Sequence, residues 1–202
     1  MQQFDLESSS DSEESVNAVY ETDLKLLNEM NDNVLSESWK SNKTSLLTKM
    51  LELEEPSITP KMVDYLLQEG VCETLLGFIT QIGTETRSDE PSESMKLSYR
   101  ATMLLSADDP SDTLLAFVSK RSGLMARHAF EIFRDDSAGS FHHAHRLLEF
   151  LLRHYPGEVY EGLVSDGMLA SRMTAMLRYI GHAPVGDMLV ALVCLTPVSR
   201  TR

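Results

Sequence analysis

Apolar residues between positions 140 and 180 recur at the spacing of two amphipathic helices. On the first helix they form one stripe, which consists of Phe141, Ala144, Leu147, Leu148, Leu151, Leu152 and Tyr155. A stripe with a period of 3.6 residues marks the face of a helix that packs against a core. On the second helix the apolar side consists of Leu169, Met173, Met176, Leu177 and Ile180. The pattern predicts that each helix buries one side and exposes the other.

The third helix of this stretch, from Val185 to Leu195, is apolar nearly all round and carries Asp187 as its one charge. A helix without a polar face is expected to be buried by neighbours on several sides. Two amphipathic helices followed by a buried one are typical of stacked helical repeats rather than of a catalytic α/β domain.

The rest of the chain also reads as helices separated by short turns. Apolar spacing predicts helices over residues 16–30, 34–53, 71–82, 95–105, 122–133 and 158–164. Two more are expected to begin at Thr59-Pro60 and Asp109-Pro110, because a capping side chain followed by proline is a helix-start signal. No stretch shows the alternation of a strand. We therefore expect an all-α, right-handed helical-repeat solenoid of the HEAT or armadillo kind over residues 16–202.

Charge is distributed unevenly along the chain, whose net charge is −13. Residues 1–94 carry 20 acidic and 6 basic side chains, whereas residues 95–202 carry 11 acidic and 12 basic ones. An acidic half is a poor nucleic-acid surface, because phosphate binding needs clusters of lysine and arginine. Residues 1–15 combine dense negative charge with low hydrophobicity, which predicts a flexible acidic N-terminal segment. Within it, Ser8 and Ser10 each precede an acidic residue by three positions and are candidate phosphorylation sites.

The two cysteines, Cys72 and Cys194, lie far apart in apolar helical runs. They support neither a disulfide framework nor a zinc site, so we expect buried thiols in a reducing compartment. The N-terminus lacks a secretory-signal pattern, and the longest apolar run, from Met188 to Leu195, is too short to span a bilayer. We expect no membrane insertion and a cytoplasmic protein, with a nuclear location also open.

Three histidines form the one cluster with metal-ligand spacing. His142 and His145 are three residues apart on a helix, which suits two ligands of one metal ion. With His143, however, they fall on the face opposite the apolar stripe, where a solvated helix face explains them. We therefore expect no metal.

Paired carboxylates at Asp108-Asp109 and Asp135-Asp136 precede predicted helices, where capping and the helix dipole explain acidic residues. The sequence contains no glycine-rich phosphate loop and no Gly-x-Ser-x-Gly elbow. We expect no catalytic residue and no cofactor, and hence a protein that is not an enzyme. Trp39, the one tryptophan, is either a core residue or an anchor for a partner.

The stretch from Tyr179 to Val190 resembles a known family. It matches the isoleucine-glycine-threonine-x-x-x-x-aspartate-leucine-leucine-leucine segment of the SAPS domain, with four residues in register: Ile180, Gly181, Asp187 and Leu189. Shorter stretches elsewhere resemble the same domain. Phe4 to Ser10 is similar to its phenylalanine-aspartate-leucine-x-serine-serine-serine opening, and Trp39, Lys40 and Asn42 are similar to its cysteine-lysine-x-x-asparagine region.

SAPS proteins are regulatory subunits of phosphatase 6-type serine/threonine phosphatases. The resemblance implies an α-helical solenoid that binds the catalytic subunit and directs it to substrates. It also implies a domain that is incomplete at the C-terminus, because the family's domain is longer than this chain. The glycine and proline near Ile180 indicate a turn between two packed helices, so we expect residues 179–190 to be structural core. Trp39, Lys40 and Asn42 are then the candidate partner-binding residues.

Two other functions remain open. A generic helical-repeat adaptor, in trafficking or nuclear transport and without a phosphatase, would have the same pattern of helices. A metal-dependent enzyme would use His142 and His145. The partner that co-purifies with the protein distinguishes the first two, and metal analysis tests the third.

Overall fold

The computed structural model describes residues 25, 39–53, 58–81 and 92–194, and every regular element in these ranges is helical. The predicted all-α class is therefore confirmed for this part of the chain. The acidic segment over 1–15, with Ser8 and Ser10, lies outside the described residues, as does the helix expected over 16–30 apart from Lys25. None of the described helices is both long and apolar enough to cross a membrane.

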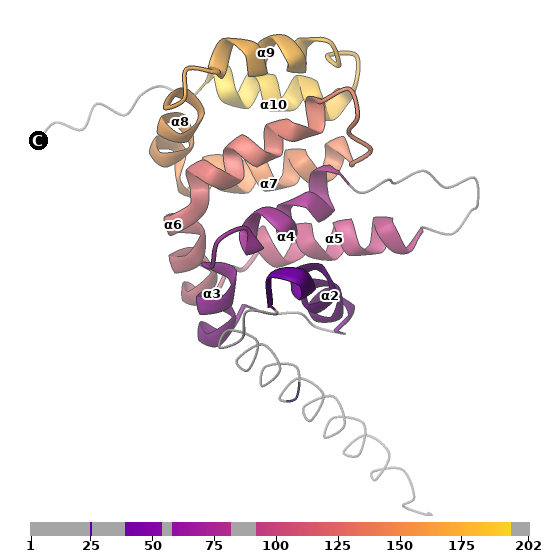
Figure 1. Ribbon diagram of the computed structural model, residues 1–202. Helices are drawn as coiled ribbons and strands as arrows, with labels where there is room; N and C mark the ends of the chain where they lie inside the picture. The colour runs from indigo at the N-terminus through magenta and orange to yellow at the C-terminus, as the bar shows by residue number, and fades with distance from the viewer. Residues whose placement is uncertain (1–24, 26–38, 54–57, 82–91, 195–202) are drawn as a thin grey trace, which may run out of the picture.

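The helices follow one another from one end of the molecule to the other (Figure 1). At one end lie α2 (Trp39–Glu52) and α3 (Pro60–Leu66), and at the opposite end lie α9 (Leu169–Leu177) and α10 (Ala183–Val193). The elements between them are α4 (Val71–Thr80), α5 (Glu93–Leu105), α6 (Asp112–Ala129), the short 3-10 helix η1 (Phe130–Phe133), α7 (Phe141–His154) and α8 (Pro156–Val164). α4 packs against α2, α5 and α6, and α7 packs against α5, α6, α8 and α10. Each helix in the middle is thus covered on more than one side.

Side-chain caps begin several helices, and one predicted start is wrong. Thr59 Oγ1 accepts a hydrogen bond from the backbone N–H of Met62 (3.3 Å), and Pro60 is the first residue of α3, as predicted. The helix expected from Asp109-Pro110 begins instead at Asp112. Its cap is Ser111, which is as good a capping residue as aspartate and places an acidic side chain in the first turn.

α6 is one helix of 18 residues, although two separate apolar runs predicted two helices. Gly123 lies in the interior of α6 and does not break the helix. The absence of a side chain at this position allows α6 to pack closely against α8. A Cβ atom added to Gly162 of α8 would lie 2.4 Å from the Cα atom of Gly123, so the two backbones are in direct contact. A side chain larger than hydrogen on Gly162 would push these helices apart.

Arginines satisfy the C-terminal ends of neighbouring helices. Arg100 of α5 donates a hydrogen bond to the carbonyl of Leu51 in the last turn of α2 (2.9 Å). Arg121 of α6 donates to the carbonyl of Leu67 at the end of α3 (2.6 Å), and Arg127 reaches the last turn of α8 in the same way. The last carbonyls of a helix have no partner within it, so a cationic donor from another helix stabilises them.

A hydrophobic core runs through the helices from Leu46 of α2 to Met188 of α10. The stripe predicted on α7 faces this core, which confirms the prediction. Four of its members are buried, namely Ala144, Leu147, Leu148 and Leu151, and the other three pack against the core while partly exposed.

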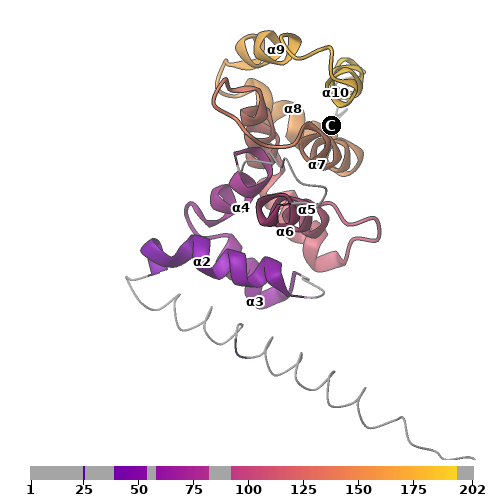
Figure 2. The same cartoon turned by 90° about the vertical axis from the view of Figure 1, so that its right-hand side faces the viewer.

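The prediction that α9 buries its whole apolar side is wrong. Within this helix only Met176 is buried, whereas the side chains of Leu177 and of Ile180, in the following turn, are 50% and 46% exposed. The reason is that α9 packs against η1 and has no described neighbour over its outer side (Figure 2).

The prediction that α10 is buried on several sides is also wrong. It packs against α7 through one side, where Val185 and Met188 are buried. On its other side, Val190 and Val193 are 63% and 73% exposed. An apolar sequence permits burial, but α10 lies at the end of the described helices, where one side has nothing to pack against.

The two cysteines differ in environment. Cys72 is buried in α4, as expected, and burial raises the pKa of its thiol to about 12. Cys194 is exposed, contrary to the expectation, because it follows the outward-facing last turn of α10. Both are free thiols.

Candidate functional site

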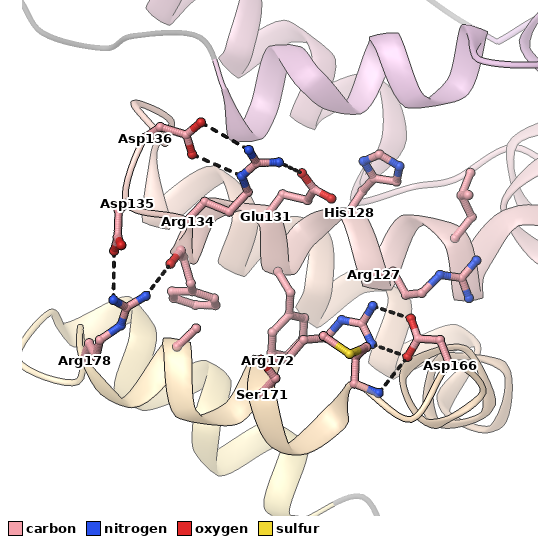
Figure 3. A pocket seen from close by; sticks show the side chains of 15 residues that line it. Arg127, His128, Glu131, Arg134, Asp135, Asp136, Asp166, Ser171, Arg172 and Arg178 are labelled. Atoms are coloured by element: carbon pink, nitrogen blue, oxygen red, sulfur yellow. Dashed lines mark hydrogen bonds and ion pairs between the residues drawn. The ribbon is translucent and has the colours of Figure 1, made fainter.

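A charged cleft opens between the end of α6, η1 with its following turn, and α9 (Figure 3). Its volume is about 670 Å³. Four arginines and four carboxylates line it, namely Arg127, Arg134, Arg172 and Arg178 with Glu131, Asp135, Asp136 and Asp166. We refer to this hollow as the arginine cleft. Its opposite charges are equal in number, so the way in which they are paired determines what it can bind.

Arg172 and Asp166 form the least exposed ion pair of the arginine cleft. Nη1 and Nη2 of Arg172 donate hydrogen bonds to the two carboxylate oxygens of Asp166 at 2.7 and 2.6 Å. Asp166 also accepts a hydrogen bond from the backbone N–H of Met168 (3.0 Å). These hydrogen bonds, that of Arg172 above all, hold the pKa of Asp166 well below its usual range. The pair therefore stays ionised and joins the end of α8 to α9.

Three other ion pairs, formed by two arginines whose side chains are more exposed, make up the rim of the arginine cleft. Arg134 donates from Nε and Nη2 to Asp136 at 3.1 and 3.2 Å, and from Nη1 to Glu131 at 3.3 Å. Arg178 pairs with Asp135 at 2.9 Å. The side chains of Asp135 and Asp136 are 79% and 74% exposed. Ion pairs in such positions contribute only about 0–1 kcal/mol, so these arginines can exchange their partners readily.

Arg127 and His128 are consecutive residues at the end of α6, and they differ in their hydrogen bonds. Arg127 donates from Nη1 to the carbonyl of Gly162 (3.1 Å), and no carboxylate of the described residues lies within ion-pair distance of it. Nδ1 of His128 is buried and has no hydrogen-bond partner within the described ranges.

Two smaller hollows continue the arginine cleft toward α4 and α2. One, of about 340 Å³, adds Gln81 and Ser137 to residues of the cleft rim. The other, of about 390 Å³, is lined by Thr44, Glu73, Thr74, Gly77, Phe78, Gln81 and His128. Both include Gln81 and each shares lining residues with the arginine cleft, so the three hollows are neighbours, and we refer to them together as the groove.

This groove is better suited to binding than to proton transfer. Each of the four carboxylates in the arginine cleft is paired with an arginine, and for Asp136 and Asp166 the hydrogen bonds from that arginine lower the pKa, which makes these two weak bases. Arginine, in turn, presents N–H groups in a planar fork that matches carboxylate and phosphate oxygens. The chemistry available here is therefore recognition of anionic groups.

The three histidines were expected to share one solvated helix face, but His143 does not lie on it. His142 is exposed, but His143 is half-buried, and its Nδ1 lies 2.7 Å from the hydroxyl of Ser98 on α5. Burial, together with the neighbouring His142, lowers the pKa of His143 below its usual value. His143 therefore belongs to the packing of α5 against α7. Among the described residues, no group of three or more His, Cys, Asp and Glu could hold a metal ion.

The residues of the family pattern are not core. Ile180, Gly181 and Asp187 are exposed and Leu189 is half-buried, because they lie in the turn between α9 and α10 and on α10 itself. They adjoin a set of exposed apolar side chains that we call the apolar end surface, which consists of Met168, Leu177, Ile180, Val190 and Val193. The expectation that residues 179–190 are buried scaffold is confirmed for Pro184, Val185 and Met188 and wrong for Ile180, Gly181 and Asp187, which are available for contact.

None of the other predicted site residues lines the groove in the part of the chain that the structure describes. The backbone of Trp39, Lys40 and Asn42 lies in α2, while their side chains, like Ser8 and Ser10, are outside what the structure describes. Conversely, the sequence did not single out the arginine cleft. Asp135 and Asp136 were interpreted as capping acids, and the spacing of the arginines, which lie on separate elements, carries no local signal.

Comparison with known proteins finds no matching family model, no matching curated protein and no matching solved structure. What bears on function is therefore the geometry of the groove, the apolar end surface, and the resemblance of residues 179–190 to the SAPS domain.

Proposed function

We propose that this protein is a non-catalytic regulatory or scaffold subunit. It binds a phosphatase 6-like serine/threonine phosphatase catalytic subunit and directs it to substrates. The helices are proposed to form a right-handed solenoid of the HEAT or armadillo kind, which offers partners a long surface rather than a single closed pocket.

The observation that carries this proposal is the position of the segment that resembles the SAPS domain. Residues 179–190 end α9, form the next turn and begin α10, and therefore lie in the apolar end surface. Exposed apolar side chains at one end of a molecule, here on α9, on α10 and in the turns beside α9, are candidates for contact with another protein. The proposed contact with the catalytic subunit is this surface, which supports a binding role for the family pattern instead of the structural role first expected.

The test uses the tagged full chain to recover serine/threonine phosphatase activity from a lysate. The double substitution Val190→Asp with Val193→Asp should lower the recovered activity at least about tenfold, because burying an unpaired carboxylate in an apolar contact costs several kcal/mol. The matched control is Tyr160→Asp on α8, a side chain that is 43% exposed and outside the apolar end surface. This control should recover as much activity as the unchanged protein.

Two results would contradict the proposal. Recovery of coat or nuclear-transport components without phosphatase activity would favour the generic adaptor instead. An equal loss of activity in the Tyr160→Asp control would exclude the apolar end surface as the specific contact.

A further inference from the structure

We propose that the arginine cleft binds the phosphate of a phosphoserine or phosphothreonine in an extended peptide, and that the adjoining groove holds the peptide chain. The inference rests on the proposed function in one respect, namely that the bound peptide belongs to a phosphatase substrate. The binding itself requires only this chain.

The phosphate would be held by Arg127 and His128. Arg127 has one hydrogen bond, to the carbonyl of Gly162, and no carboxylate of the described residues lies within ion-pair distance of its guanidinium, although Asp166 is near enough for the two charges to interact. His128 also lines the cleft, where its imidazole ring can contribute an N–H group. The three terminal oxygens of a phosphate group can accept hydrogen bonds from both side chains at once.

The rim supplies additional donors. The pairs of Arg178 with Asp135 and of Arg134 with Asp136 are exposed, and the two aspartates project toward solvent, where water screens their charge. A phosphate can replace the aspartate on Arg178 at little cost, because the released carboxylate is rehydrated. Arg172 is different, since both of its terminal nitrogens are occupied by Asp166, and it serves to fix α9 rather than to bind the ligand.

The balance of charge in the cleft favours phosphate over carboxylate. Four arginines already face four carboxylates, so one more singly charged carboxylate gains little by exchange. A phosphorylated side chain carries a charge of about −1.5 to −2 and an additional acceptor oxygen. It can therefore compete with an aspartate that is held only at the surface.

The shape of the groove indicates a peptide rather than a small anion. The hollow next to His128 is bordered by Gly77, in the interior of α4. Glycine there lowers helix stability by about 1 kcal/mol relative to alanine. Unlike Gly123 and Gly162, it is not required by packing, because an added Cβ would meet only the side chain of Gln81 at 3.7 Å. Because Gly77 has no side chain, the backbone of a bound peptide can approach α4 closely at this position.

The position of the cleft connects this binding to the proposed function. Arg178 lines the cleft, and the preceding residue, Leu177, belongs to the apolar end surface. A peptide bound in the arginine cleft would thus lie beside a catalytic subunit docked on that surface.

The experiment measures binding of labelled peptides to the purified full chain by fluorescence anisotropy. The probes are a peptide with one phosphoserine and the same peptide without the phosphate. The phosphopeptide should bind at least about tenfold more tightly, because hydrogen bonds to charged groups contribute about 1.5–3 kcal/mol. Arg127→Gln should remove most of this difference, and Arg178→Gln, on the opposite side of the cleft, should remove less of it. The matched control Arg153→Gln, which removes an exposed arginine paired with Glu149 on α7, should not.

A second variant tests the groove without changing charge. Gly77→Leu places a side chain in the hollow next to His128, where the helix itself has space. It should weaken a long phosphopeptide about tenfold and leave a peptide truncated to the phosphoserine and its immediate neighbours unaffected. Thermal unfolding of each variant verifies that it is folded.

Equal affinity for the phosphorylated and unphosphorylated peptides would overturn the inference, and so would an equal loss in the Arg153→Gln control. These outcomes are independent of the phosphatase experiment. Phosphopeptide binding without recovery of phosphatase activity would contradict the proposed function and leave the arginine cleft as a phosphopeptide site.

Discussion

At the crossing of α6 with α8 the two backbones touch, whereas at the end formed by α9 and α10 large apolar side chains face solvent. A Cβ atom on Gly162 would clash with the Cα atom of Gly123 at 2.4 Å, and a Cβ atom on Gly123 would be tight, at 3.1 Å from backbone atoms of α8. Val190 and Val193, by contrast, are mostly exposed although they lie in one of the most apolar segments of the chain. The difference teaches that hydrophobic sequence does not determine burial by itself, because burial also needs a neighbour.

The largest effect is expected at the crossing itself. Gly162→Ala should lower the free energy of unfolding by about 3 kcal/mol or more, because its Cβ would lie 2.4 Å from backbone atoms of α6 that cannot move aside. Urea unfolding followed by circular dichroism measures this. The matched control, Gly186→Ala in α10, has open space around the new Cβ and should stabilise the protein by about 0.5–1 kcal/mol. If Gly162→Ala left the free energy of unfolding unchanged, the close contact between α6 and α8 would be contradicted.

Two adjacent residues on α9 test the boundary between closed and open packing. Met176→Ala should cost about 2–5 kcal/mol, since this side chain is fully buried. Leu177→Ala should cost less than about 1 kcal/mol, because half of that side chain is already exposed. The same urea titration compares them. Equal losses would mean that the outer side of α9 is covered in solution.

The closed part of the molecule should also respond to pH through His143. Burial favours its neutral form, so its folded pKa lies below its usual value of 6.5. Its contribution to stability is therefore complete above that value and is lost as the pH falls through the lower folded pKa. Thermal unfolding midpoints should fall less between pH 7 and 5 in His143→Gln than in the unchanged protein. His142→Gln removes only the lesser of the two causes of the lowered pKa and should retain most of the dependence.

The smallest effect is expected at the open end. Val193→Ser should change the free energy of unfolding by no more than about 0.5 kcal/mol, because the side chain is 73% exposed. A larger loss in the urea titration of dilute protein would indicate that α10 packs against something in solution, and repeating it at higher protein concentration would identify self-association.

The sequence predicts best those helices whose apolar side chains pack against a neighbouring helix in the structure. The stripe on α7 predicts its buried face because every member meets the core or its edge. Thr59 and Pro60 predict the start of α3 through local hydrogen bonding alone. The prediction that α10 is buried on several sides is wrong because an apolar sequence shows only which side chains a helix could bury. It does not show whether another helix lies next to them.

The candidate site was beyond prediction for a different reason. Arg127, Arg134 and Arg178 lie on three separate elements, so their convergence depends on how η1 and α9 pack together. The acids of the turn after η1 were assigned to helix capping, which is a local explanation. Their actual partners are arginines, one of them more than 40 positions along the chain at Arg178.

The arginines that close the ends of neighbouring helices have a consequence for how the molecule comes apart. Arg100 and Arg121 reach backward to carbonyls of α2 and α3, and Arg127 reaches forward to α8. Detaching one helix would leave backbone carbonyls without their partner in another, so peeling from either end is penalised beyond the loss of apolar contact. An array of helices that could fray one by one is thereby joined into a cooperative unit, which should unfold in a single transition.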